Sequence, residues 1–365
     1  MTLSKQFNIL VCPLEWGLGH AGRMIPLVRR LQEKGHNVFI GAGSELQRFF
    51  RSELTGVKYI DFRGFSPSYS VQLPQYAALL MRLPVLIFHI IAEHIRLKRI
   101  IKDNKIDIVI SDNRFGLWNR KIKSIYLTHQ VRIPFPEKFR SLEWIGTGFH
   151  RFIIKKYSFC FIPDLPGELN LSGRLSHGVN MTLTTRFIGI LSRFTDCYPS
   201  QHPEKESFPD ITIILSGPEP QKGILRQILV GIFKEKELKV VILEGKPGTI
   251  EPVTRIGNTI SYNHLSSGEM AELLSGSKNI ITRSGYTSIM ELVSLNRSAL
   301  LIPTPGQTEQ EYLARYLSAK GWFMTVSQRA LNLETVLLPP KQFDSVKMVA
   351  ESRILLEEAL DEILK

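Results

Sequence analysis

Two series of short apolar runs, each run separated from the next by a helical pattern, constrain the fold of this chain most strongly. The first series begins with residues 7–13 and continues through runs at 37–42, 57–62, 106–111, 124–128 and 159–162. The second series has runs at 211–215, 239–243, 279–282 and 299–302. Short apolar runs that alternate with helical segments are typical of βαβ units, which build parallel sheets. The sequence therefore predicts an α/β protein with two Rossmann-like domains, whose parallel sheets face each other across a cleft.

A polar stretch separates the two series. Residues 195–210 read TDCYPSQHPEKESFPD and contain three prolines, a composition typical of linkers. We therefore predict an N-terminal domain over 1–194 and a C-terminal domain over 211–340, joined by a linker at 195–210. Residues 341–365 form a last segment whose pattern predicts an amphipathic helix, and this helix could pack back on the N-terminal domain.

The overall composition excludes several classes of protein. The chain has 365 residues, of which 43% are hydrophobic and 22% are charged, as in ordinary globular domains. Its three cysteines, Cys12, Cys160 and Cys197, are too scattered for a disulfide framework or a zinc site, which predicts a cytoplasmic location. The first residues lack the pattern of a signal peptide, and no uncharged apolar run approaches the ~20 residues of a spanning helix.

The excess of positive charge lies in one part of the chain. Residues 1–190 carry a net charge of +14 and the remainder carries −2. A basic surface attracts nucleic acid, phospholipid or a phosphorylated substrate, and the absence of a nucleic-acid-binding motif weighs against the first. Residues 76–102 are strongly apolar and end in basic side chains. This segment is either a core helix with a solvated end or a patch that binds an anionic membrane, at the inner face of the plasma membrane.

A glycine-rich loop follows the first apolar run. Gly17 and Gly19 allow backbone N–H groups to approach a phosphate or a sugar at the start of a helix. The spacing of GLGHAG fits a dinucleotide-binding loop, but the second run ends in GAG (41–43) without an acidic residue, which disfavours NAD. His20 stands where the loop meets the helix. Neutral imidazole can accept a hydroxyl proton, so His20 is the candidate base, with Glu15 orienting it or competing for the role. A solvated histidine is the alternative.

The segment 279–326 carries the second group of candidate residues. A predicted strand runs into Arg283, Ser284 and Gly285, and a helix starts there, so backbone amides and a hydroxyl can meet a phosphate. Thr287 adds a hydroxyl in the first turn, and the carboxylate of Glu291 could accept two ribose hydroxyls. The next loop carries Gln307, Glu309 and Gln310, whose amide and carboxylate groups suit a sugar.

These residues resemble a known family. The pattern RSG-x-T-x-x-x-E-L, then I-P-x-P-x-Q-x-E-Q, then a helix ending in Lys-Gly, is similar to nucleotide-sugar glycosyltransferases of the GT-B fold. It resembles family 28 in particular, which includes the lipid-linked N-acetylglucosaminyltransferase of peptidoglycan synthesis. Weaker matches are GLGHAGRMIPL, His129-Gln130, the FIG sequence at 187–189 and the SGP sequence at 216–218.

The resemblance implies a role for each matching residue. Ser284 and Gly285 would hold a diphosphate with Ser216 and Gly217, and Glu291 would bind the ribose. Three features depart from the family: Glu309 stands where Asp is common, Leu313 stands where Asn is usual, and the N-terminal loop has GLGH where a more glycine-rich version is usual. These departures bear on the donor sugar more than on the nucleotide. The remaining implied groups are a turn that frames the base (Tyr262, Asn263, His264, Leu265), the donor-sugar residues (Gln307, Glu309, Gln310) and an acceptor loop near His20 (Gly17, Gly19, His129, Gln130).

The resemblance predicts an inverting glycosyltransferase. It would move a hexose or an N-acetylhexosamine from a UDP-sugar to a hydroxyl acceptor, which could be lipid-linked, in cell-envelope glycan synthesis. No Asp-x-Asp motif is present, so no metal and no other cofactor is expected. Two alternatives remain open, a nucleotide-sugar epimerase of the same fold and a non-catalytic subunit that binds a nucleotide sugar.

Overall fold

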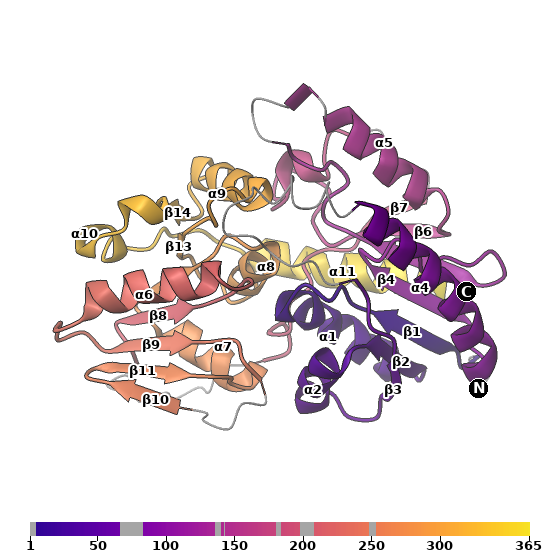
Figure 1. Ribbon diagram of the computed structural model, residues 1–365, viewed down its shortest axis with the longest axis horizontal. Coiled ribbons are helices and arrows are strands. Elements are labelled where there is room, and N and C mark those ends of the chain that lie inside the picture. Colours follow the sequence, from indigo (N-terminus) through magenta and orange to yellow (C-terminus); the bar gives the residue numbers. More distant parts are fainter. Residues whose placement is uncertain are drawn as a thin grey trace.

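The computed structural model describes residues 5–65, 83–135, 140–141, 143–179, 184–197, 208–247 and 253–365. Two α/β domains lie side by side, and the last helix, α11 (Val346–Ile363), passes from one to the other (Figure 1). Each domain has a central sheet between layers of helices. Of the predicted linker, residues 198–207 lie outside the described part of the chain.

The N-terminal sheet is parallel throughout and has the strand order β3-β2-β1-β4-β5-β6-β7. Its central strands are buried on both faces, which is why they appear in the sequence as continuous apolar runs. The chain winds outward from β1 in one direction and then from β4 in the other, so a topological switch point lies between these two strands. The strands are β1 (Asn8–Cys12), β2 (Asn37–Ala42), β3 (Lys58–Asp61), β4 (Ile108–Asp112), β5 (Lys123–Leu127), β6 (Phe159–Ile162) and β7 (Thr185–Phe187).

The helices of the N-terminal domain differ in how many of their apolar side chains they bury. Helix α1 packs one long face into the core, including Met24, Leu27 and Leu31. Helices α4 and α5 instead leave several large apolar side chains exposed. The elements are α1 (Leu18–Glu33), α2 (Ser44–Glu53), α4 (Leu83–Asn104), α5 (Glu143–Ile154) and the short η2 (Gly173–Leu175).

The C-terminal sheet has the order β10-β11-β9-β8-β12-β13-β14, and its switch point lies between β8 and β12. All neighbouring pairs are parallel except the edge hairpin of β10 and β11. The strands are β8 (Ile211–Ile214), β9 (Val240–Leu243), β10 (Val253–Ile256), β11 (Thr259–Tyr262), β12 (Asn279–Thr282), β13 (Leu300–Leu301) and β14 (Met324–Thr325). The helices are α6 (Gln221–Phe233), α7 (Ser267–Gly276), α8 (Tyr286–Ser294), α9 (Thr308–Ala319), η4 (Gln328–Ala330) and α10 (Leu333–Val336).

Helix α11 connects the two cores. Near its start, Met348 packs into the C-terminal core, and farther on, Leu356 and Leu360 pack into the N-terminal core. Lys34 of α1 forms ion pairs of 2.8 Å with both Glu357 and Asp361. The final helix therefore helps to fix how the two domains lie relative to each other.

Candidate active site

A histidine and an aspartate meet at the switch point of the N-terminal sheet. His20 lies in the first turn of α1, which follows β1 after a short loop, and Asp112 is the last residue of β4. The Nδ1 atom of His20 is 2.8 Å from Oδ2 of Asp112, which is fully buried. Gly17 has a φ of 105°, so the tight turn that carries His20 to this place depends on glycine.

Arg23 lies one helical turn after His20 and is 1% exposed. Its Nε donates a hydrogen bond of 3.0 Å to Oδ2 of Asp112, and its Nη2 donates to Oδ1 of the same carboxylate. Burial opposes ionisation of Asp112, but the charge of Arg23 and the hydrogen bonds from Arg23 and His20 outweigh it and lower the pKa of Asp112 to about 2. Arg23 thus holds Asp112 as a buried carboxylate.

His20 stays neutral near pH 7. Burial and the charge of Arg23 lower the pKa of His20, and together they outweigh the opposite effect of Asp112. Nδ1 of His20 faces two groups, Oδ2 of Asp112 at 2.8 Å and Nη2 of Arg23 at 2.9 Å, and Nη2 already donates to Oδ1 of Asp112. Because the ionised carboxylate accepts hydrogen bonds and cannot donate them, we assign the proton of His20 to Nδ1, which donates to Asp112. The lone pair of Nε2 is then free to accept a proton from a hydroxyl.

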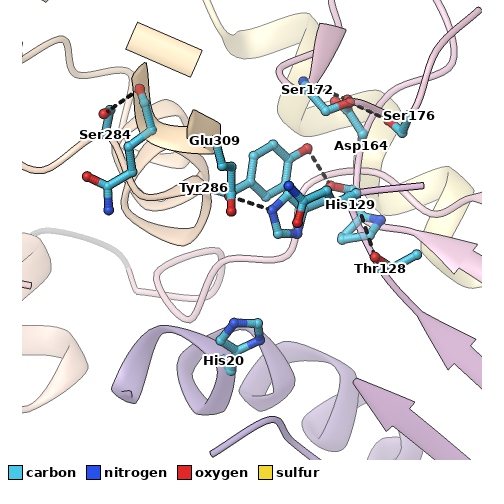
Figure 2. A network of polar contacts seen from close by, with 12 residues as sticks. His20, Thr128, His129, Asp164, Ser172, Ser176, Ser284, Tyr286 and Glu309 are labelled. Carbon is cyan, nitrogen blue, oxygen red and sulfur yellow. Dashed lines mark hydrogen bonds and ion pairs between the residues drawn. The ribbon is translucent and has the colours of Figure 1, made fainter. Parts of the chain in front are cut away.

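His129 joins the two domains. It follows β5, and its Nε2 lies 2.8 Å from Oε1 of Glu309 in α9. Its ring stacks on Tyr286, the first residue of α8, with the ring centres 4.2 Å apart and the planes 6° apart. Figure 2 shows these three side chains together with His20. The Tyr286 hydroxyl in turn donates to the carbonyl of Pro163, which follows β6. Residues at the strand ends of one sheet therefore contact residues at the strand ends of the other.

The first turns of two helices come together in the same region. Helices α1 and α8 begin after Gly17 and Gly285, and neither has a side-chain cap or an acidic residue in its first turn. A Cβ atom on Gly19 would lie 3.3 Å from the Thr287 side chain, so glycine is what permits this close approach. Uncapped N–H groups and the positive ends of helix dipoles favour an anion here.

The side chains of Arg283 and Ser284 are used within the C-terminal domain. Arg283 is fully buried, and it donates to the carbonyls of Ile302, Pro303 and Gln221 at 3.3, 3.3 and 2.8 Å. Burial lowers its pKa to about 10. The hydroxyl of Ser284 donates a hydrogen bond of 2.8 Å to the carbonyl of Gln310. These two residues therefore hold together the loops around the start of α8, while the backbone at Gly285 remains available for an anion.

Glu291 pairs with an arginine that comes from the other side of the domain boundary. The Nε atom of Arg193 donates a hydrogen bond of 2.8 Å to Oε1 of Glu291, and both side chains are largely buried. The same oxygen would lie 3.4 Å from a Cβ on Gly22. Glu291 therefore lies at the boundary between α8 and α1. A ribose hydroxyl that bound this carboxylate would have to compete with Arg193 for it.

The other expected donor residues lie around the same strand ends. Ser216 and Gly217 follow β8, and Gly217 has a φ of 92°. Beyond β11, the carbonyl of Asn263 accepts from the Lys246 backbone, the ring of His264 lies edge-on to Phe49 of α2 at 5.8 Å, and Leu265 packs on the C-terminal core. Gln307 precedes α9, and the side-chain oxygen of Gln310 accepts from the Thr304 backbone.

Two expected N-terminal residues have local contacts. The carboxylate of Glu15 accepts a 2.6 Å hydrogen bond from the backbone of Gly43, just before α2 begins. Gln130 donates its backbone N–H to Thr128 at 3.1 Å. Sequence reasoning missed Asp112, Arg23 and Tyr286, although the position of Asp112 at the end of an apolar run beside the first strand was a signal that could have identified it.

Helices α4 and α5 expose apolar side chains on the N-terminal domain. On α4, Phe88 is 69% exposed, and on α5, Trp144 is 71% exposed. The loop residue Trp118 links the helices, because it contacts His94 of α4 and lies under Lys156, which follows α5. Of the predicted segment 76–102, residues up to 82 lie outside the described part. Among the described residues, no helix is both long and apolar enough to cross a membrane, and no group of three or more acidic, histidine or cysteine side chains is placed to hold a metal.

Comparison with known proteins identifies relatives of both domains. Residues 219–346 match the model of the glycosyltransferase family 28 C-terminal domain. An uncharacterized glycosyltransferase of Methanosarcina mazei is 21% identical over 336 residues, which cover 84% of this chain and 82% of that protein. A UDP-N-acetylglucosamine–N-acetylmuramyl-(pentapeptide) pyrophosphoryl-undecaprenol N-acetylglucosamine transferase of Clostridium perfringens is 27% identical over 129 residues, which are 34% of each chain.

Solved structures share the two-domain architecture. The glycotransferase of kitacinnamycin matches with a TM-score of 0.65 at 13% identity, over 98% of this chain and 96% of that one. The spinosyn rhamnosyltransferase complexed with thymidine diphosphate matches with a TM-score of 0.60 at 15% identity, with the same coverage. The predicted fold class is confirmed by these matches, and the predicted resemblance to family 28 is confirmed by the model match in the C-terminal domain.

Proposed function

Since this chain is a glycosyltransferase of the GT-B fold with a family 28-like C-terminal domain, we propose that it transfers a sugar from a UDP-sugar to an acceptor hydroxyl with inversion. The observation that carries the proposal is the His20–Asp112 pair beside the uncapped start of α8. A base close to an anion-binding helix end is what a single displacement needs, and α1 and α8 approach each other at Gly19 and Thr287. The sugar is a hexose or an N-acetylhexosamine, in line with the partial match to an N-acetylglucosamine transferase.

The chemistry follows from these groups. The acceptor oxygen attacks C1 of the donor sugar while its proton moves to Nε2 of His20, and Asp112 stabilises the imidazolium that forms. The bond between C1 and the phosphate oxygen breaks, and the nucleoside diphosphate leaves with its electron pair. The N–H groups at the start of α8 stabilise that developing charge. We propose that this replaces a metal ion, with no other cofactor required.

The first test is nucleotide binding followed by turnover. UDP should raise the melting temperature of the protein by several degrees at 100 times its Kd, because a ligand that binds only the folded state stabilises it by about 2.7 kcal/mol. Turnover of UDP-N-acetylglucosamine or UDP-glucose with a lipid-linked acceptor should release UDP and persist in EDTA. Release of an altered nucleotide sugar from donor alone would instead establish the epimerase, and binding without any turnover would establish a non-catalytic subunit.

We further propose that the exposed faces of α4 and α5 bind an anionic membrane at its cytoplasmic side, where a lipid-linked acceptor would lie. Phe88, Ile91 and Ile95 form an apolar row on α4, and Lys98 and Lys102 continue that helix as a basic end. Helix α5 contributes a second apolar group, in which Trp144, Ile145, Phe149 and Phe152 are exposed. Apolar side chains beside basic ones favour the interface of an anionic bilayer, and the net charge of +14 over residues 1–190 adds long-range attraction.

Flotation with liposomes tests this surface. Wild-type protein should float with vesicles that contain phosphatidylglycerol and not with pure phosphatidylcholine, and added salt should weaken the binding. The double variant Phe88→Asp, Trp144→Asp should lose flotation, whereas Ile354→Asp, which replaces a 60% exposed apolar residue on α11, should keep it. Failure of wild-type protein to float at low salt would contradict the membrane surface and leave the transfer reaction untouched.

A further inference from the structure

His129 belongs to the N-terminal domain, yet two of its three ring partners belong to the C-terminal domain. Its ring stacks on Tyr286 of α8, its Nε2 contacts Glu309 of α9, and its Nδ1 contacts Arg23 of α1. The ring is 5% exposed. A side chain from one domain is therefore buried between two elements of the other, and those two elements carry the proposed diphosphate and donor-sugar groups.

Arg23 decides which ring nitrogen of His129 carries the proton. A guanidinium can only donate, so the 3.1 Å contact from Nη1 of Arg23 makes Nδ1 of His129 the acceptor. In the neutral ring the proton is then on Nε2, and this N–H donates to Glu309. Burial opposes ionisation of Glu309, but the contact with His129 and the nearby charge of Arg23 together lower the pKa of this carboxyl. An anionic oxygen thus already occupies the position in front of Nε2.

The stacking on Tyr286 places this N–H beside the start of α8. Tyr286 is the first residue of the helix, so the free backbone N–H groups of α8 begin at the residue whose ring His129 covers. A diphosphate held by α8 would bring phosphate oxygens to the same imidazole. Glu309 would then be free to accept hydrogen bonds from the sugar hydroxyls that the family resemblance assigns to it.

We propose that His129 donates a hydrogen bond from Nε2 to the donor phosphate that is bonded to C1 of the sugar. When no donor is bound, Glu309 accepts this hydrogen bond instead. The inference rests on the proposed function, because it requires a nucleoside diphosphate at α8. His129 is thereby a donor-binding residue contributed by the opposite domain, which differs from its expected place in an acceptor loop. As the bond to C1 breaks, negative charge grows on this phosphate, and a preorganised donor stabilises it without transferring a proton.

Calorimetry with UDP and UMP tests the proposal. In His129→Ala, the affinity for UDP should fall about tenfold or more, because a hydrogen bond to a charged phosphate is lost, while the affinity for UMP should stay unchanged. His129→Asn, which keeps an N–H donor, should recover part of the UDP affinity. Unchanged UMP binding also reports that the variant is folded.

Three results would overturn the role of His129. Equal losses for UDP and UMP would make the residue structural, unchanged UDP affinity would mean that it does not contact the phosphate, and tighter UDP binding would mean that the pair with Glu309 blocks the donor. The same experiment with thymidine diphosphate and monophosphate separates this proposal from the choice of donor. If the wild-type protein binds thymidine diphosphate more tightly than thymidine monophosphate but shows no such difference between UDP and UMP, the UDP-sugar assignment fails. The role of His129 is then tested with the two thymidine nucleotides. If the wild-type protein binds neither diphosphate more tightly than its monophosphate, both proposals fail.

Discussion

Replacing His20 by alanine should lower kcat by about a thousandfold and leave the KM for the donor within a few-fold. The reason is that the variant loses the proton acceptor, a contribution typically worth 10²- to 10⁴-fold, while the helix ends that bind the diphosphate are unchanged. Asp112→Asn is the matched change, because it keeps the size of the residue but removes the carboxylate that orients Nδ1 of His20. It should also lower kcat. A purified His20→Ala protein with wild-type turnover would show that another group is the base.

The pH dependence of kcat/KM follows from the same pair. Only neutral His20 can accept the proton, so the rate should fall as the pH drops through the pKa of His20. Burial and Arg23 lower that pKa, so the acid limb should have its midpoint below 6.5. The limb should disappear in His20→Ala, in which the residual rate no longer depends on this group. A limb centred above 7 would contradict the neutral imidazole that we assign.

Asp112→Ala should reduce the free energy of unfolding by about 3–5 kcal/mol. The substitution leaves the guanidinium of Arg23, which is 1% exposed, buried without the carboxylate that now neutralises it. Urea denaturation followed by circular dichroism would measure the change. The double variant Arg23→Met, Asp112→Leu should recover much of the loss, because it removes both charges and fills the volume. A loss below about 1 kcal/mol in Asp112→Ala would mean that water reaches Arg23 and replaces the carboxylate.

The contribution of Asp112 to stability also depends on pH in a defined direction. Its pKa in the folded protein, about 2, is below the ordinary value of 3.8. The folded state therefore binds fewer protons than the unfolded state in this range, and stability rises with pH. The contribution is fully present above about pH 4–5 and is lost as the pH falls toward 2. Asp112→Ala should therefore show a smaller loss of stability between pH 5 and pH 2 than the wild-type protein.

The strands whose bounds were predicted most closely are those buried on both faces. The runs at 37–42, 159–162 and 279–282 coincide with β2, β6 and β12, because a central parallel strand needs apolar residues without interruption. The hairpin of β10 and β11 was missed. All four residues of β10 are exposed at the sheet edge, so no apolar pattern marks them. Helix α5 was also missed, since its exposed apolar face blurs the periodicity on which helix prediction rests.

The candidate site could be predicted only in part from the sequence. His20 and Gly285 were identified because each lies where a predicted strand gives way to a helix, which is where parallel sheets bind ligands. The contacts between the site residues were not predicted. Asp112 lies 92 residues from His20, and Glu309 lies 180 residues from His129, so neither contact leaves a local pattern. Arg283 and Ser284 were expected to face a phosphate, yet their side chains bond to carbonyls of their own domain.

The amino-acid order alone determined the two parallel sheets and the loops at their strand ends, because burial and chain direction act locally along the sequence. The tertiary structure decided which of those loops meet, which carboxylate each histidine contacts and which charges are buried. These properties depend on distances between residues far apart in the chain. A hydrogen bond forms only within about 3.5 Å, and a pKa responds to charges within several ångströms, so both are set by the packing of the domains and not by the spacing of residues in the sequence.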